Sequence, residues 1–197
     1  MIGLIHPPHR CRGFTLLELM VTITIVAVLV AIGVPGLHDT IQRNRISMAS
    51  NDLLASVAYA RTTAIDRGQL VSMCPSADGS SCTTSGEAFE PGWIVYTYPA
   101  GVASANKAYV AGSATLLRAI GQRTGVSIHA LQTPVITFGL QGQLRPDDAT
   151  LEFLTCSRSA DSGIGTSITT VPGMDMKVNS SGSVTTQALA AGAPCGS

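Results

Sequence analysis

The residue whose type and position most clearly suggest chemistry is Glu18. It precedes a run from Leu19 to Leu37 that contains no charged residue and is rich in Val, Ile, Leu and Ala. A carboxylate in such a span costs roughly 2.5 to 3.5 kcal/mol near the centre of a membrane and less near its end, so its retention suggests a function. It needs a cationic partner. The simpler alternative is a glutamate tolerated at the interface, where its head reaches water.

Other groups suited to acid–base or nucleophilic chemistry are few. Beyond the apolar run the chain holds two histidines, His38 and His129. It has no G-x-S-x-G elbow, phosphate-binding loop or H-E-x-x-H helix. We expect His129 to be a sheet residue and Asp147-Asp148 to lie in a turn or loop, with calcium binding there the less favoured alternative. The sequence therefore predicts no enzyme, no cofactor and no metal site.

The element that positions Glu18 is a predicted membrane helix. At about 1.5 Å per residue, Phe14 to Val34 would be roughly 30 Å long, the thickness of a hydrocarbon core. Arg10 and Arg12 precede it, so we expect the N-terminus to stay cytoplasmic and the rest to be exported. The alternative is a secretory signal cut near Ala31-Ile32-Gly33, but the run exceeds the usual 7 to 15 apolar residues.

Beyond Pro35, apolar residues recur at steps of three and four, which is typical of one helix face. They are Ile46, Ala49, Leu53, Val57, Ala60 and Ala64. Gly68 is a suitable C-terminal stop. The pattern predicts one long helix that runs from the membrane into the domain and bends near Gly33 and Pro35.

After Gly68, short β-branched and aromatic runs alternate with Gly, Ser and Pro, which predicts strands. The expected strands are Leu70 to Cys74, Trp93 to Tyr98, Thr115 to Ile120, Val126 to Ala130, Val135 to Phe138, Thr150 to Cys156, Ser167 to Val171, Met174 to Val178 and one near Val184. A tail of small residues from Ala188 to Ser197 would fray unless tied down.

Length and charge exclude several classes. The 197 residues suit one domain with an attached element. Only 12% are charged and the mean hydropathy is +0.31, which disfavours disorder. The 12 basic and 12 acidic residues cancel, which excludes a strongly basic nucleic-acid binder.

The residues around Glu18 read Arg12-Gly13-Phe14-Thr15-Leu16-Leu17-Glu18-Leu19, and Pro35 follows the span. This pattern resembles the class III signal of type IV pilins and pseudopilins. The resemblance implies that a prepilin peptidase cuts after Gly13 and methylates Phe14, and that Pro35 is the family's helix-bending proline. Cleavage would create a free amine at Phe14, so Glu18 of one subunit could pair with a neighbour's amine in a low-dielectric filament core.

Later segments narrow the resemblance to the GspH/FimT branch. In the family's order they are Ala60-Arg61 through Gly68, Val71 to Pro75, Gly92 to Tyr96, and Ile136 to Phe138 followed by Gly142. The branch implies a pilin-like α+β fold, in which a long N-terminal helix with a transmembrane half and an amphipathic half packs on an antiparallel β-sandwich-like domain. We expect a removed leader at 1–13, a transmembrane and assembly segment at 14–35, the amphipathic half at 36–68 and a β-rich exported domain with disulfides at 69–197.

Of the five cysteines, Cys11 precedes the expected cut, which leaves four in the exported part. An even number fits a disulfide framework, and four cysteines allow three pairings. We prefer Cys74 with Cys82 across a Ser/Gly turn and Cys156 with Cys195, which would pin the tail. A zinc site is the alternative, but the spacing does not suit paired CxxC ligands and histidines are scarce.

DNA binding is a functional competitor, because some FimT-like pilins serve in DNA uptake through arginines near their C-terminal strands. At the corresponding turn this chain reads Asn179-Ser180-Ser181-Gly182-Ser183-Val184, with no arginine after the glycine. From Thr40 onward 10 basic and 10 acidic residues balance, so the domain has no net attraction to phosphates. A local patch that could still contact DNA, as the less favoured alternative, consists of Arg118, Arg123, Arg145 and Arg158.

The favoured interpretation is a structural subunit of a type IV pilus-type filament, a low-copy minor pilin that takes part in pilus initiation or assembly. The alternatives are the H-type pseudopilin of type II secretion and a DNA-binding minor pilin for DNA uptake. The pilus is preferred because the Cys74 to Cys82 loop followed by Gly92-Trp93 resembles the pilus members. Expected partners are other pilins or pseudopilins, prepilin peptidase and the inner membrane, with DNA less favoured. We expect a single-pass inner-membrane protein whose periplasmic domain then enters the pilus or pseudopilus.

Overall fold

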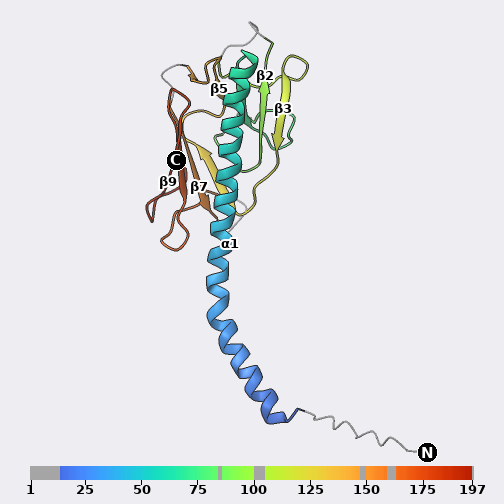
Figure 1. Ribbon diagram of the computed structural model, residues 1–197, viewed down its shortest axis with the longest axis vertical. Coiled ribbons are helices and arrows are strands. Elements are labelled where there is room, and N and C mark those ends of the chain that lie inside the picture. The colour runs from blue at the N-terminus through green and yellow to red at the C-terminus, as the bar shows by residue number, and fades with distance from the viewer. Residues whose placement is uncertain (1–13, 84–85, 100–104, 147–149, 159–162, 197) are drawn as a thin grey trace, which may run out of the picture. The chain divides into compact units, whose positions relative to one another are not determined.

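A single long helix precedes the strands in the computed structural model (Figure 1). The structure describes residues 14–83, 86–99, 105–146, 150–158 and 163–196, apart from the side chains of residues 34 and 35. The chain divides into two compact units, one ending at His38 and the other beginning at Asp39. The second unit holds the β-sheets and the core.

Helix α1 (Leu16–Arg67) has 52 residues and no break in its helical assignment. It ends where the sequence predicts, because Gly68 takes the left-handed backbone conformation with a φ of 59°. The Gly68 N–H donates to the Ile65 carbonyl and the Gln69 N–H to the Ala64 carbonyl, both at 3.3 Å, which closes the last turn. The bend expected near Gly33 and Pro35 stays a prediction.

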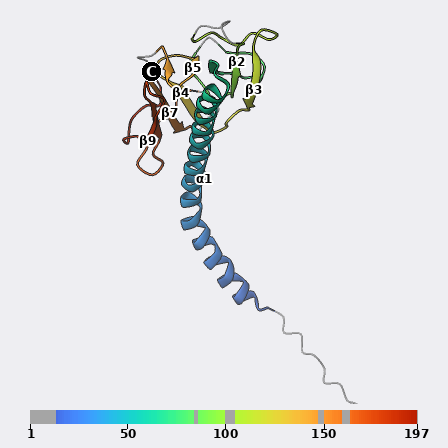
Figure 2. The ribbon, with the colours of Figure 1, turned by 45° about the horizontal axis from the view of Figure 1, so that its top comes forward.

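The second half of α1 supplies the predicted apolar face. All six residues of the stripe are buried, with at most 2% of their surface exposed. They pack in one core with residues of both sheets, and Figures 1 and 2 show this half of the helix lying against the strands. Burying such a stripe is what stabilises a helix of this kind, since propensity alone contributes little.

Nine strands form two antiparallel sheets in the described part of the chain. The five-stranded sheet has the order β3-β2-β1-β5-β6, from β1 (Val71–Pro75), β2 (Trp93–Thr97), β3 (Thr115–Ile120), β5 (Ile136–Phe138) and β6 (Leu144–Arg145). The four-stranded sheet has the order β4-β7-β8-β9, from β4 (Val126–Ala130), β7 (Leu151–Ser157), β8 (Met174–Val178) and β9 (Val184–Ala188). This arrangement confirms the expected pilin-like α+β fold.

One predicted strand is wrong and one observed strand is missing from the prediction. Ser167 to Val171 forms a turn, in which Ile168 and Val171 exchange backbone hydrogen bonds of 3.2 and 3.1 Å. The Ser167 hydroxyl holds this turn to the domain by accepting from the Gly173 N–H and donating to the Leu189 carbonyl. The missed strand is β6, whose two residues are too few to show a periodic pattern.

The only tryptophan lies in the core and joins the sheets to the helix. Trp93 is fully buried and packs near Phe89, with ring centroids 6.5 Å apart. Its indole N–H donates to the Ser56 hydroxyl of α1 at 2.9 Å, and that hydroxyl donates to the Asp52 carbonyl. A buried indole N–H needs a hydrogen-bond acceptor. Ser56 provides it, which explains a polar residue on the buried side of the helix.

Candidate filament-assembly site

The first turn of α1 is fixed by Thr15, directly before the helix. Its hydroxyl accepts from the Glu18 N–H at 3.2 Å, and its carbonyl accepts from the Leu19 N–H at 3.1 Å. Thr15 is therefore an N-cap, and Glu18 at the third helical position adds a negative charge that favours a helix N-terminus. The Thr-x-x-Glu capping-box signature could have revealed this in the sequence. The sequence points to Glu18 through its charge in an apolar span and its place in the pilin-type signal, and the cap adds a local structural role.

The segment after Glu18 exposes an apolar surface. Its large apolar residues, from Leu19 to Ile32, are each at least half exposed. Within the described residues α1 is the one helix long and apolar enough to cross a membrane, with a mean hydropathy of 2.6 in its most apolar window. The hydroxyls of Thr22 and Thr24 donate to the helix's own Leu19 and Met20 carbonyls. These two polar groups are thus satisfied without water, as a lipid or protein surrounding requires.

The residues predicted to act in cleavage and assembly are partly visible. Phe14 is 82% exposed and Glu18 is also exposed, so both are open to a partner. Gly13 and the rest of the leader lie outside the described residues, and so does the side chain of Pro35. The pairing of Glu18 with a neighbour's amine stays a prediction.

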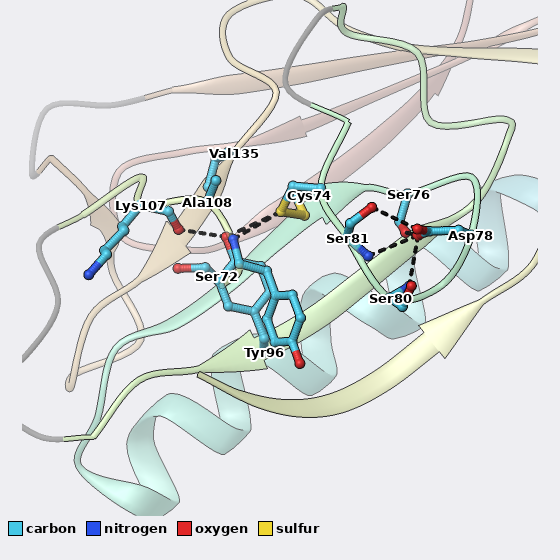
Figure 3. Close-up of a disulfide and its surroundings, with 12 residues drawn as sticks. Ser72, Cys74, Ser76, Asp78, Ser80, Ser81, Tyr96, Lys107, Ala108 and Val135 are labelled. Atoms are coloured by element: carbon cyan, nitrogen blue, oxygen red, sulfur yellow. Dashed lines mark hydrogen bonds between the residues drawn. A yellow bond between two sulfur atoms is a disulfide. The ribbon is translucent and has the colours of Figure 1, made fainter. Parts of the chain in front are cut away.

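In the second unit, a disulfide joins Cys74 of β1 to Cys82, eight residues on (Figure 3). The loop that it closes is organised around the Asp78 carboxylate. The backbone N–H groups of Ser80 and Ser81 donate to Asp78 at 2.9 and 2.8 Å, and the hydroxyls of Ser81 and Ser76 donate at 2.7 and 3.0 Å. These bonds, the Ser80 N–H first, hold the pKa of Asp78 well below its usual value.

A tyrosine cluster packs beside this disulfide on the outer face of the five-stranded sheet. Tyr96 is buried, its hydroxyl donates to the Lys107 carbonyl at 2.7 Å, and its ring meets that of Tyr109 edge-on. The Tyr109 N–H lies 3.1 Å from the Cys82 sulfur. Burial raises the pKa of the Tyr96 phenol above its usual value. These contacts are those of a packed structural face.

The second disulfide joins Cys156 of β7 to Cys195, across a separation of 39 residues. Both disulfides are the pairs expected from the sequence. The tail is also held by backbone bonds, because the Cys195 N–H donates to the Gly165 carbonyl at 3.0 Å and Thr166 bridges Pro194. Both cysteines are fully buried beside Leu154, so the tail covers part of the four-stranded sheet.

The arginines proposed for DNA contact are engaged in the fold. Arg158 is 7% exposed and lies 3.1 Å from Glu90, which is 9% exposed. Arg123 lies 2.8 Å from Asp52 and over the Trp93 ring, while the Arg118 guanidinium lies over the Tyr59 ring. Arg145 lies in β6. A DNA phosphate could reach Arg158 only by leaving the buried Glu90 carboxylate unpaired, which argues against this arginine as a contact. Contact of the four arginines with DNA stays a prediction.

A further arginine that sequence reasoning passed over joins α1 to two turns. The Arg61 guanidinium donates to the Gly142 carbonyl at 3.0 Å and to the Ser181 carbonyl at 3.3 Å. Gly142 and Gly182 have positive φ angles, and a Cβ on either would come within about 3 Å of Arg61. The two glycine-containing turns that face Arg61 could not be recognised from sequence, because the contacts join residues 81 and 120 positions apart.

The described residues contain no group of three or more His, Cys, Asp or Glu side chains that could hold a metal ion. His129 lies in β4, where it pairs with Leu154 across the ladder.

Comparisons with known proteins agree with this description. Residues 8–34 match the prokaryotic N-terminal methylation motif. Two fimbrial proteins of Pseudomonas aeruginosa are each 30% identical over 67 residues, which is 34% of this chain and 44% of theirs. The chain thus spans less than half the length of these relatives.

Two crystal structures of the type IV minor pilin FimU of Pseudomonas aeruginosa share the fold. They superpose with TM-scores of 0.51 and 0.50 at 16% and 17% identity, over 76% and 74% of this chain and 96% and 98% of theirs. Residues 49–185, more than half of the chain, match the family described as type II transport protein GspH. The chain therefore belongs to the GspH family of minor pilins and pseudopilins, which are structural proteins and not enzymes.

Proposed function

We propose that the chain is a low-copy minor pilin that takes part in initiating or assembling a type IV pilus. The observation that carries the proposal is the exposed apolar half of α1, headed by the capped Glu18 and matched by the methylation motif. A surface of this size and hydropathy is stable only in lipid or against other apolar helices. A pilin meets both surroundings, first the lipid of the inner membrane and then the neighbouring helices of the filament.

Assembly would proceed through Glu18 and the Phe14 amine. Prepilin peptidase would cut after Gly13 and methylate Phe14, leaving a positive charge four residues before Glu18. The Glu18 carboxylate of one subunit then pairs with the amine of its neighbour as the helices enter the filament core. In a low-dielectric core an unpaired carboxylate is costly, so this pairing sets the axial register of neighbouring subunits.

The alternative is the H-type pseudopilin of type II secretion. The description of the matched family supports it, whereas the fold of FimU and the identity to fimbrial proteins support a pilus. Deleting the gene and scoring twitching and exoenzyme secretion separates the two. Loss of twitching with normal secretion is expected, and loss of secretion with normal twitching would establish the pseudopilin.

The role of Glu18 has its own test. Glu18→Gln keeps the shape and loses the charge, so the chain should be cut and methylated normally but recovered in sheared filaments at a severalfold lower level. Thr22→Ser, on the same helix, keeps a hydroxyl that can donate to the Leu19 carbonyl and is the matched control. Normal recovery of the Gln variant in filaments would refute the pairing.

A further inference from the structure

The free edge of β9 is an unpaired row of backbone groups. Four of its five residues are exposed, and it lies at one flank of the second unit in both ribbon views (Figures 1 and 2). It pairs with β8 on one side and has no strand partner on the other within the described residues.

The hydrogen-bond pattern shows which groups face outward. In the β8–β9 hairpin, the Asn179 N–H donates to the Ser183 carbonyl and the Leu189 N–H donates to the Gly173 carbonyl. In an antiparallel ladder every second residue pair is hydrogen-bonded. The backbone groups of Thr185 and Gln187 therefore point toward β8. The N–H and C=O groups of Thr186, and of Val184 and Ala188, therefore point to the free edge.

The other ends of the two sheets are covered or irregular. At β4, the Phe89 N–H donates to the Ile128 carbonyl at 2.7 Å and Ala88 bridges His129. At β6, the Leu144 N–H donates to the Ser180 carbonyl at 2.9 Å. The β2–β3 pairing shifts register between Val95 and Tyr96, a bulge that hinders extension of the sheet.

By contrast, β9 carries none of the features that protect an edge. Its sequence, Val-Thr-Thr-Gln-Ala, has no charge and no proline, and its ladder with β8 is regular over all five residues. Edge strands that do not pair with another chain are usually short, charged, bulged or covered by another element. An open and regular edge of this kind suits addition of a strand, in which backbone bonds supply affinity and neighbouring pockets supply specificity.

A pocket of about 420 Å³ adjoins this edge on the outer face of the four-stranded sheet. Glu152, Lys177 and Thr185 line it side by side, as the register of β7, β8 and β9 requires. Lys177 lies 3.3 Å from both Glu152 and Asp175, and the second Asp175 oxygen is buried without a hydrogen-bond partner. Glu152 and Lys177 line the pocket with opposite charges, and the buried Asp175 lies behind Lys177 outside the lining. The three groups together carry one net negative charge, which favours a basic side chain in the pocket.

We propose that the β9 edge docks an edge strand of a different pilin-like subunit, with a lysine or arginine of that strand seated beside Glu152. The proposal rests on the proposed function as a filament subunit. A second copy of this chain is a poorer occupant, because its own open edge, β9, carries no lysine or arginine to place beside Glu152. Its β3 edge is bulged, and Arg118 of β3 already lies over the Tyr59 ring.

The test places a photo-crosslinking amino acid at Ala188 of the full chain, expressed with the filament machinery intact. Light should then yield an adduct whose cross-linked peptide comes from a strand of another pilin-like subunit and holds a lysine or arginine. Thr186→Pro removes one outward N–H without touching the ladder to β8, and should lower the yield about tenfold. Thr186→Ala keeps the N–H and should leave the yield unchanged.

Glu152→Lys reverses the charge of the pocket with the backbone edge intact, and should lower the yield severalfold. Removal of the leader, followed on the same blot, reports separately on the proposed function. The inference is overturned by an adduct to a second copy, by no adduct to a pilin-like subunit, or by an undiminished yield in both Thr186→Pro and Glu152→Lys chains.

Discussion

The two disulfides should differ in their contribution to stability, because they close loops of different length. On the chain-entropy model, a cross-link over 39 residues stabilises by about 4 kcal/mol and one over eight residues by about 2.5 kcal/mol. Replacing Cys156 and Cys195 together by alanine should therefore lower the free energy of unfolding more than replacing Cys74 and Cys82.

The packing around the longer link adds to the difference. Cys195 is fully buried against Cys156 and Leu154, so releasing the tail exposes apolar surface that the fold now covers. On the other side, the Asp78 hydrogen bonds hold the shorter loop even without its disulfide. We expect the loss for the longer link to exceed that for the shorter one by at least about 1.5 kcal/mol.

The assay is urea unfolding of the mature chain in detergent micelles. Trp93 is the only tryptophan and is fully buried in the second unit, so its fluorescence reports on that unit alone. The two double-alanine variants are matched in chemistry and in the number of sulfurs removed. Equal losses, or a larger loss for Cys74 and Cys82, would refute the reasoning from loop length and tail packing.

Three further substitutions test the contacts that hold the domain together. Glu90→Ala leaves the buried Arg158 unpaired and should cost about 3 to 5 kcal/mol in urea unfolding, and a cost below about 1 kcal/mol would contradict a buried ion pair. Gly142→Ala should lower the free energy of unfolding more than the control Gly112→Ala. Both glycines have a positive φ, but only at Gly142 would the new Cβ lie within 3 Å of other side chains. Equal losses in the two variants would show that the neighbours of Gly142 move aside. For Asp78, whose pKa is lowered in the fold, the stabilising effect is complete above the unfolded pKa of about 4 and is lost as the pH falls toward the folded value. The stability advantage of the natural chain over Asp78→Asn should therefore shrink between pH 5 and about pH 2, and a difference independent of pH would exclude the carboxylate as its cause.

Features written in local sequence could be predicted well. The buried face of α1 follows from apolar spacing, its end follows from Gly68, and β3, β4 and β8 have the predicted bounds. The signal around Gly13 and Glu18 is also local, which is why the family could be inferred from a short stretch.

Features that depend on residues far apart in the chain could not be predicted. The Glu90–Arg158 pair joins residues 68 apart, so Arg158 looks like a free surface cation in sequence. The β-branched residues of 167–171 resemble a strand, but hydrogen bonds to Gly173 and Leu189 hold them as a turn. The open edge of β9 likewise becomes visible only when the order of the strands is known.

The most direct test of the proposed assembly function is the mass of the N-terminal peptide of the mature protein, purified from membranes of cells that contain prepilin peptidase. We predict a peptide that begins at Phe14 and carries one N-methyl group. A chain that still begins at Met1, or one that begins after Gly33 as a secretory signal would leave it, would contradict both the cleavage at Gly13 and the pairing assigned to Glu18.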